Sequence, residues 1–178
     1  MSVNKVCSST GHRPSKFNFK YDEEHIDCIR LKAKLINEIE RLYLKGFKIF
    51  LTGCAMGVDI WCGEIVLQLM KKYKDIQLFS ILPCNNYYIN WSENYKQRLK
   101  NIMKNCTKTI LLQERYSNDC YLKRNIYLVD KANLILAVYD INSDKSGTKN
   151  TLQYAIKKEK EVIIINIDDL QIYRYFRF

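Results

Sequence analysis

Two predicted strands of this chain, over residues 3–9 and 48–51, each run directly into a Thr-Gly turn. The first turn continues into Arg13, and the second leads to a helix that opens at Gly57. An arginine guanidinium and the free amides at the start of a helix both bind anions. We therefore expect a nucleotide or another phosphorylated ligand at one edge of a parallel sheet.

Arg13 is the strongest single candidate in the first turn. Pro14 follows it, stiffens the loop and keeps Arg13 extended. One charge-assisted hydrogen bond from a guanidinium contributes roughly 1.5–3 kcal/mol, against roughly 0.3–1 kcal/mol from a helix amino end alone. His12 could stack on a base, bond a ribose or fill the turn. The alternative is a surface turn without a ligand.

The second turn supplies two glycines and an acidic residue. Gly53 and Gly57 permit a close approach of the backbone to a ligand. Asp59 could accept a hydrogen bond from a ribose hydroxyl, or it could complement the dipole of its helix. Asp59 and Glu64 are also the two candidates for a catalytic carboxylate, although their five-residue spacing does not place them on one helix face.

Other predicted turns add polar and aromatic residues. Gly147 and Thr148 end a polar loop and open the next helix, which suits a phosphate or a plain N-cap. Trp91 and Tyr95 could sandwich a base or pack in the core. The residues predicted to bind the ligand are Thr10, Gly11, His12, Arg13, Gly53, Gly57, Asp59, Pro83, Trp91, Arg124, Asn125, Gly147 and Thr148.

Apolar strands alternate with amphipathic helices along the chain. The expected helices span about 22–45, 58–73, 91–105, 121–131 and 148–158, and the strands span 3–9, 47–51, 76–82, 107–112, 134–139 and 161–167. This order predicts an α/β, Rossmann-like, doubly wound and mostly parallel sheet of about six strands with helices on both faces. The loops after strands one, two, three and five then form the pocket.

The composition predicts one ordered domain over residues 1–178. Two prolines and six glycines leave no linker, and no apolar run approaches the roughly 20 residues of a membrane span. The seven cysteines are scattered without a Cys-x-x-Cys pair, which indicates reduced thiols in the cytoplasm. With two histidines, neither beside a cysteine, we expect no metal site and no cofactor.

The formal net charge of +10 attracts polyanions and small phosphorylated ligands alike. Much of the excess is lysine on predicted helix faces, which indicates a solvated surface more than a nucleic-acid interface. The tail over residues 173–178 alternates aromatic and basic residues. It could stack on nucleic-acid bases, or dock on the domain or on a second subunit.

Taken in order, these motifs resemble the YpsA-like family of the SLOG superfamily over nearly the whole chain. The resemblance rests on Thr-Gly-His-Arg-Pro at 10–14, Gly-x-x-x-Gly-x-Asp at 53–59 with Trp61 and Glu64, Leu-Pro-Cys at 82–84 with Trp91-Ser92, Tyr116, Arg124-Asn125 and Asp130, and Ser-Gly-Thr at 146–148. It implies a Rossmann-like fold, a pocket for a nucleotide-type ligand and a homo-oligomer.

The superfamily includes cytokinin-activating phosphoribohydrolases, DNA-processing protein A and sensor domains for nucleotide signals related to ADP-ribose. The phosphoribohydrolases carry Pro-Gly-Gly-x-Gly-Thr-x-x-Glu, and here Thr151 stands where that glutamate would be. A threonine cannot supply the carboxylate that supports an oxocarbenium-like centre or activates water. This departure argues against the same hydrolysis, unless Asp59 or Glu64 supplies a carboxylate from the other wall.

Three functions follow from these observations. The first is a cytoplasmic protein that binds a nucleotide or an ADP-ribose-like ligand, without membrane attachment. The second is a hydrolase that cleaves the glycosidic or phosphate bonds of nucleotides, so whether the protein is an enzyme stays open. The third, motivated by the charge and the tail, is a protein that binds single-stranded nucleic acid.

Overall fold

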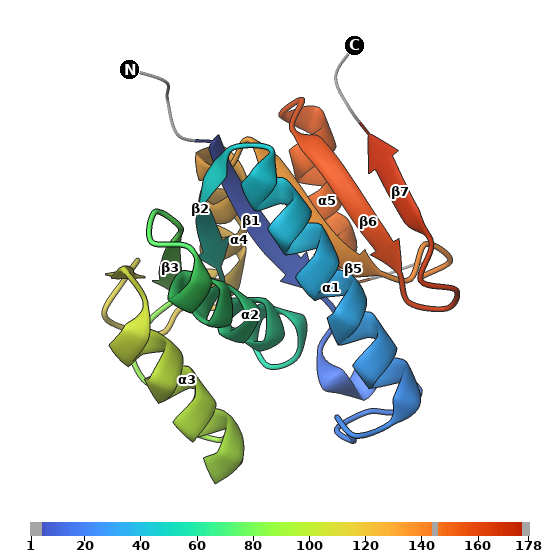
Figure 1. Ribbon diagram of the computed structural model, residues 1–178. Helices are drawn as coiled ribbons and strands as arrows, with labels where there is room; N and C mark the ends of the chain where they lie inside the picture. The colour runs from blue at the N-terminus through green and yellow to red at the C-terminus, as the bar shows by residue number, and fades with distance from the viewer. Residues whose placement is uncertain (1–4, 144–145, 176–178) are drawn as a thin grey trace.

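The computed structural model describes residues 5–143 and 146–175 (Figure 1). The strands are β1 (Lys5–Gly11), β2 (Phe47–Thr52), β3 (Gln77–Leu82), β4 (Lys108–Leu111), β5 (Leu134–Tyr139), β6 (Glu161–Asn166) and β7 (Ile172–Tyr175). The helices are α1 (Ile26–Leu44), α2 (Val58–Lys72), α3 (Glu93–Asn105), α4 (Cys120–Lys131) and α5 (Gly147–Lys157), with a 3-10 turn, η1, at Pro14–Lys16.

The strands form one sheet in the order β4-β3-β2-β1-β5-β6-β7. Every neighbouring pair is parallel except β6 and β7. Helices α1 and α2 cover one face, with α3 packed beside α2, and α4 and α5 cover the other (Figure 1). The predicted α/β, Rossmann-like, doubly wound fold is confirmed.

Strand order reverses at β1, which pairs with β2 on one side and with β5 on the other. The crossovers from β1 to β4 progress toward one edge, and the chain then returns to place β5 against β1. In such sheets the crevice for a ligand lies beyond the carboxyl ends of the strands at this reversal. The loops that follow β1 and β5 therefore flank the natural site.

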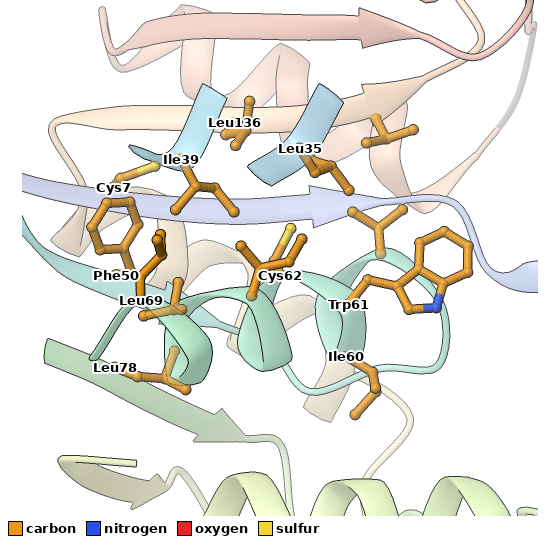
Figure 2. Close-up of a cluster of buried hydrophobic side chains, with 14 of the residues drawn as sticks. Cys7, Leu35, Ile39, Phe50, Ile60, Trp61, Cys62, Leu69, Leu78 and Leu136 are labelled. Atoms are coloured by element: carbon orange, nitrogen blue, oxygen red, sulfur yellow. The ribbon is translucent and has the colours of Figure 1, made fainter. Parts of the chain in front are cut away.

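The central strands of the sheet are buried between the two helix layers. Leu35 and Ile39 of α1 pack with residues of α2 over the centre of the sheet, as Figure 2 shows. Along β5, alternate residues enter two clusters, Leu136 on this face and Ile135 on the other. The central strands are thus buried on both faces, as expected of parallel strands between helix layers.

The sheet has a seventh strand, β7, in addition to the six that the sequence predicts. Residues Ile172–Tyr175 pair antiparallel with β6, and Arg174 bonds the carboxylate of Glu38 at 3.1 Å. A four-residue edge strand with a basic residue inside it carries too short an apolar pattern to be recognised from sequence. The described part of the tail therefore docks on its own sheet.

Most predicted boundaries agree within a few residues, and α1 differs most. His25 caps this helix, because its Nδ1 accepts a hydrogen bond from the amide of Asp27 at 3.2 Å, so the helix begins at Ile26. Residues 3 and 4 of the first predicted strand, 144 and 145 of the polar loop and 176–178 of the tail lie outside the described residues. Across the described ranges, none of the helices combines the length and the apolar character that crossing a bilayer requires.

Candidate functional site

A pocket of about 280 Å³ lies beyond the carboxyl ends of β1 and β2. Its wall comes from the end of β1 and its loop, the loop after β2, and the first turns of α2, α4 and α5. The lining residues are Thr10, Gly11, His12, Arg13, Ser15, Lys16, Ala55, Asp59, Tyr121, Arg124, Asn125, Ser146, Gly147 and Thr148. It occupies the crevice at which the strand order reverses.

Arg13 stands at the exposed edge of this pocket. Its backbone is extended, with φ −74° and ψ 157°, and Pro14 opens the turn η1 directly after it. The guanidinium carbon lies 5.9 Å from the centre of the Tyr121 ring, a cation–π contact. Among the described residues, the side chain of Arg13 has no ion-pair or hydrogen-bond partner, while its backbone carbonyl accepts a hydrogen bond from the amide of Lys16 at 3.0 Å. The charge of Arg13 is therefore available to an anion.

The floor of the pocket is a buried pair, Asp59 and Arg124. Arg124 Nη1 lies 3.5 Å from Asp59 Oδ2 and also donates to the carbonyl of Gly53, while its Nε donates to Asn125 Oδ1 at 2.8 Å. The amide of Ala55 donates to Asp59 Oδ2 at 3.2 Å. Burial raises the pKa of Asp59 above its usual value, and Arg124 opposes that rise.

His12 joins the loop after β1 to the loop after β5. Its Nε2 accepts a hydrogen bond from the amide of Asp140 at 3.2 Å, and its ring packs 5.4 Å from the ring of Tyr139. Burial lowers the pKa of His12, and because its Nε2 accepts the hydrogen bond from Asp140, the ring proton lies on Nδ1. This residue lines the pocket and also fixes the shape of the pocket.

The amino end of α5 opens into the pocket. Ser146 is the N-cap, and its Oγ accepts a hydrogen bond from the amide of Lys149 at 3.0 Å. Gly147 and Thr148 both line the pocket, and a Cβ added at Gly147 would meet no atom within 4 Å. The first amides of this helix carry its positive dipole end, which attracts an anion.

Comparison with known proteins assigns the chain to a family. The model of the YpsA family, described as the YspA SLOG family, matches residues 7–170. The chain belongs to this SLOG family. It is also similar to a UPF0398 protein of Bacillus cereus and to one of Bacillus thuringiensis, each 26% identical over 163 residues, which are 89% of this chain and 85% of the relative. Those names specify neither a ligand nor a reaction.

Three glycines of this YpsA-family chain serve internal packing beside the pocket. A Cβ on Gly11 would meet Val58 at 2.5 Å, and one on Gly53 would meet Asp59 Oδ2 at 2.7 Å. Gly57 has φ +90°, and a Cβ there would lie 2.8 Å from the carbonyl oxygen of His12. Gly53 and Gly57 were predicted to admit a ligand, but the space next to their Cα atoms is filled by the protein.

Several predicted residues lie outside this YpsA-family pocket. Gly53, Gly57, Pro83 and Trp91 do not line it. Trp91 lines a separate hollow with Tyr21, Met56 and Tyr95, and its ring packs 5.4 Å from that of Tyr87. Helix α3, which Trp91 precedes, packs beside α2.

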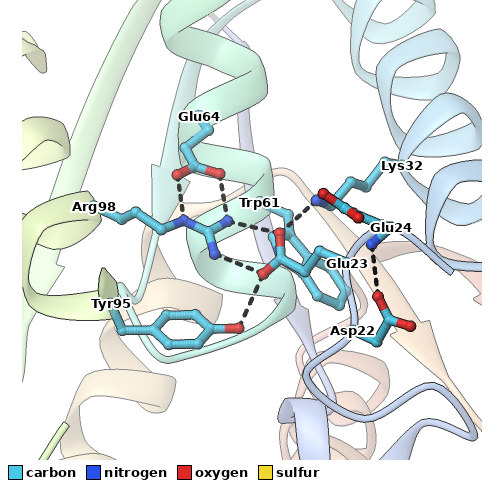
Figure 3. A network of polar contacts seen from close by, with 8 residues as sticks. All are labelled: Asp22, Glu23, Glu24, Lys32, Trp61, Glu64, Tyr95 and Arg98. Carbon is cyan, nitrogen blue, oxygen red and sulfur yellow. Dashed lines mark hydrogen bonds and ion pairs between the residues drawn. The ribbon is translucent and has the colours of Figure 1, made fainter. Parts of the chain in front are cut away.

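Glu64 also lies elsewhere, in a polar network between α2 and α3. Its carboxylate accepts two hydrogen bonds from Arg98, each 2.7 Å long. Figure 3 shows Arg98 between Glu64 and Glu23, which also accepts from Lys32, Trp61 and Tyr95. The structure thus gives Glu64 an ion-pair partner instead of a place in the pocket.

Five lining residues were not predicted from the sequence: Ser15, Lys16, Ala55, Tyr121 and Ser146. For Tyr121 a signal existed, because it precedes Arg124 and Asn125 by three and four positions and so shares their helix face. Ser146 carries the N-cap signal of α5. Within the described ranges, no group of three or more His, Cys, Asp or Glu side chains could hold a metal ion.

Proposed function

We propose that this protein binds a nucleotide or a nucleotide-derived, ADP-ribose-like ligand in the pocket beyond β1 and β2. The observation that carries the proposal is the convergence of an unpaired guanidinium, that of Arg13, and the amino end of α5 on one pocket. Arg13 and the first amides of α5 bind the phosphate, and the polar floor around Asp59 faces the sugar.

The energies favour transfer of Arg13 from Tyr121 to a phosphate. An exposed cation–π contact is worth about 0.5–1 kcal/mol, whereas a hydrogen bond between two charged groups contributes about 1.5–3 kcal/mol. Arg13 is exposed and is tied by no other described side chain. A phosphate at the mouth of the pocket, beyond the reach of the stacked guanidinium, therefore draws Arg13 off the ring.

The size of the pocket bears on the ligand. Its volume of about 280 Å³ lies just below the roughly 300–1,000 Å³ that small-molecule sites occupy. A nucleoside monophosphate or a sugar phosphate suits this volume. An ADP-ribose-like molecule would place one half inside and extend the other over the exposed edge at Arg13.

A second candidate is hydrolysis of such a ligand with Asp59 as the acid. The pKa of Asp59 is raised by burial, as a general acid requires, and this carboxylate lines the pocket. Asp59 is nevertheless the one carboxylate among the lining residues that the structure describes, so a paired-carboxylate mechanism finds no second member among them. Thr151, at the position of the phosphoribohydrolase glutamate, donates its hydroxyl to the carbonyl of Gly147 at 2.9 Å.

The test is a thermal-shift screen of the full chain against nucleotides, dinucleotides, ADP-ribose derivatives, cyclic nucleotides and short oligonucleotides. A ligand at a hundredfold excess over Kd stabilises the folded state by about 2.7 kcal/mol. Each hit is repeated with Arg13→Ala and with Arg30→Ala, an exposed arginine that does not line the pocket.

A shift that is lost in Arg13→Ala and kept in Arg30→Ala supports the proposal. A shift that both variants keep, or no shift across the panel, contradicts it. Chromatography of each hit separates binding from turnover, because intact ligand indicates a binding protein and released base or phosphate indicates a hydrolase. In the second case Asp59→Asn must abolish product release if Asp59 is the acid.

Two further predictions concern the setting of this site. A cytoplasmic location and a homo-oligomer both stay predictions, the first from the cysteine pattern and the second from the family resemblance. Light scattering of the purified chain measures the oligomeric state directly.

A further inference from the structure

Tyr121 forms an aromatic side of the pocket. Its ring lies 6.5 Å from the rings of Tyr116 and Tyr87, at interplanar angles of 68° and 78°. Neither neighbour stacks parallel on it, whereas the guanidinium of Arg13 lies over it at 5.9 Å from the centroid. The flat group that lies over this ring is therefore Arg13.

The cation–π contact with Tyr121 is weak, so a phosphate beyond the reach of the stacked guanidinium draws Arg13 off the ring. The present inference rests on the proposed function, in which the phosphate takes the guanidinium. Once Arg13 has moved, a face of the Tyr121 ring is left open to the pocket. An exposed aromatic face next to a bound sugar phosphate is a stacking surface for a base.

The position of Tyr121 suits this role. It is the second residue of α4, and Arg124 and Asn125 follow it at the helical spacing that places all three on one face. Its neighbour Tyr87 is anchored, since the hydroxyl of Tyr87 donates to the carbonyl of Cys54 at 3.0 Å. One nucleotide could therefore place its base on Tyr121 and its sugar over Asp59 and Arg124.

We propose that Tyr121 stacks on the nucleobase and makes the site select purine nucleotides over pyrimidine nucleotides and sugar phosphates. Every base has a π face and can stack on the ring. The strength of stacking depends on the area of the base and little on its hydrogen-bonding edge. Affinity then rises from ribose 5-phosphate to UMP to AMP, with GMP close to AMP.

The experiment titrates ribose 5-phosphate, UMP and AMP into the full chain by calorimetry, for the wild type, Tyr121→Ala, Tyr121→Phe and Tyr116→Ala. Stacking predicts that AMP binds about 5- to 150-fold more tightly than ribose 5-phosphate. Tyr121→Ala removes that difference without weakening the binding of ribose 5-phosphate, because loss of the ring also releases Arg13 from its cation–π contact. Tyr121→Phe keeps it, and so does Tyr116→Ala, which removes a neighbouring exposed ring that does not line the pocket.

Equal affinities of the wild type for AMP and ribose 5-phosphate overturn the stacking role and leave the proposed phosphate site standing. A loss of both ligands to the same degree in Tyr121→Ala, with Tyr121→Phe intact, overturns it in favour of a purely structural ring. Absence of binding by all three ligands contradicts the proposed function as well. Thermal unfolding of each variant without ligand shows whether it is folded.

Discussion

The loop between β1 and α1 carries a charged residue near each end, and the two lie in opposite environments. Near its end, Glu23 accepts hydrogen bonds from Arg98, Lys32 and other donors, so its charge is fully engaged (Figure 3). At its beginning, the side chain of Arg13 forms no ion pair or hydrogen bond with the described residues, and it borders a pocket. Engaged charges hold a fold together, whereas an unpaired charge beside a pocket indicates a ligand.

The carboxyl group of Glu23 in the network and that of Asp59 in the pocket differ in the direction of their pKa shifts. Burial alone would raise the pKa of Glu23, but hydrogen bonds from Arg98, Lys32 and Trp61 outweigh it and lower the pKa to about 2. At Asp59 the effect of burial is the larger one, and its pKa rises in spite of Arg124. The network thus stabilises the charged form of Glu23, whereas the surroundings of Asp59 in the pocket disfavour its charged form.

The largest expected effect is the acid sensitivity of the network. The folded pKa of Glu23, about 2, lies below the ordinary value of 4.5, so the unfolded chain binds more protons between these two values. The stabilisation is complete above about pH 4.5 and is lost as the pH falls through about 2; its size is about 3 kcal/mol. The free energy of unfolding, measured with urea from pH 6 to pH 2, should fall more steeply with decreasing pH for the wild type than for Glu23→Gln.

Equal slopes for the two proteins would contradict the role of Glu23. Glu64→Gln is the matched control, because Glu64 shares Arg98 but has no other charged partner among the described residues.

The next effect is the removal of the central cation. Arg98→Ala leaves Glu23 and Glu64 without their shared guanidinium, so we expect a loss of about 2–3 kcal/mol, less than for a fully buried pair because Arg98 keeps 18% of its side-chain surface. Lys72→Ala, which breaks an exposed pair with Glu40, should change stability little. Chemical denaturation measures both, and similar losses would remove the distinction between buried and exposed pairs.

A smaller effect separates the two kinds of glycine at the pocket. Gly53→Ala pushes a methyl group into Arg124 and Asp59, which predicts a loss of about 1–3 kcal/mol from overpacking. Gly147→Ala adds a methyl group in open space and should cost nothing. Denaturation midpoints give the comparison, and a larger loss in Gly147→Ala would show that the pocket is packed differently.

The smallest effect on stability is expected at Arg13. Arg13→Ala removes an exposed side chain with a single cation–π contact, so the free energy of unfolding should change by no more than about 1 kcal/mol. Differential scanning calorimetry of the free protein checks this. A loss near that of Arg98→Ala would mean that Arg13 is structural and that the contrast between the two ends of the loop is false.

Much of this architecture follows from local patterns. Alternating helices and apolar strands predict a parallel sheet, and parallel strands bring their carboxyl ends to one edge. The turns that contain Arg13, Asp59 and Thr148 could therefore be placed together before their distances were known. The bounds of β5 match the prediction because its run of buried apolar residues ends sharply at both sides.

The sequence could not predict which neighbouring element each side chain of a helix faces. Glu64 lies on α2 as Asp59 does, but it faces α3 and pairs with Arg98, 34 residues further along. Trp91 comes just before α3 and lines a separate hollow. A single chain carries no local signal for a partner on another helix, so both residues were assigned to the site by order alone.

The most direct test of the central claim is a crystal structure of the protein with the tightest ligand of the thermal-shift panel. The account predicts a phosphate within hydrogen-bonding distance of the Arg13 guanidinium and of the first amides of α5, with Arg13 displaced from Tyr121. A ligand bound in another hollow, with Arg13 still lying over Tyr121, would contradict it.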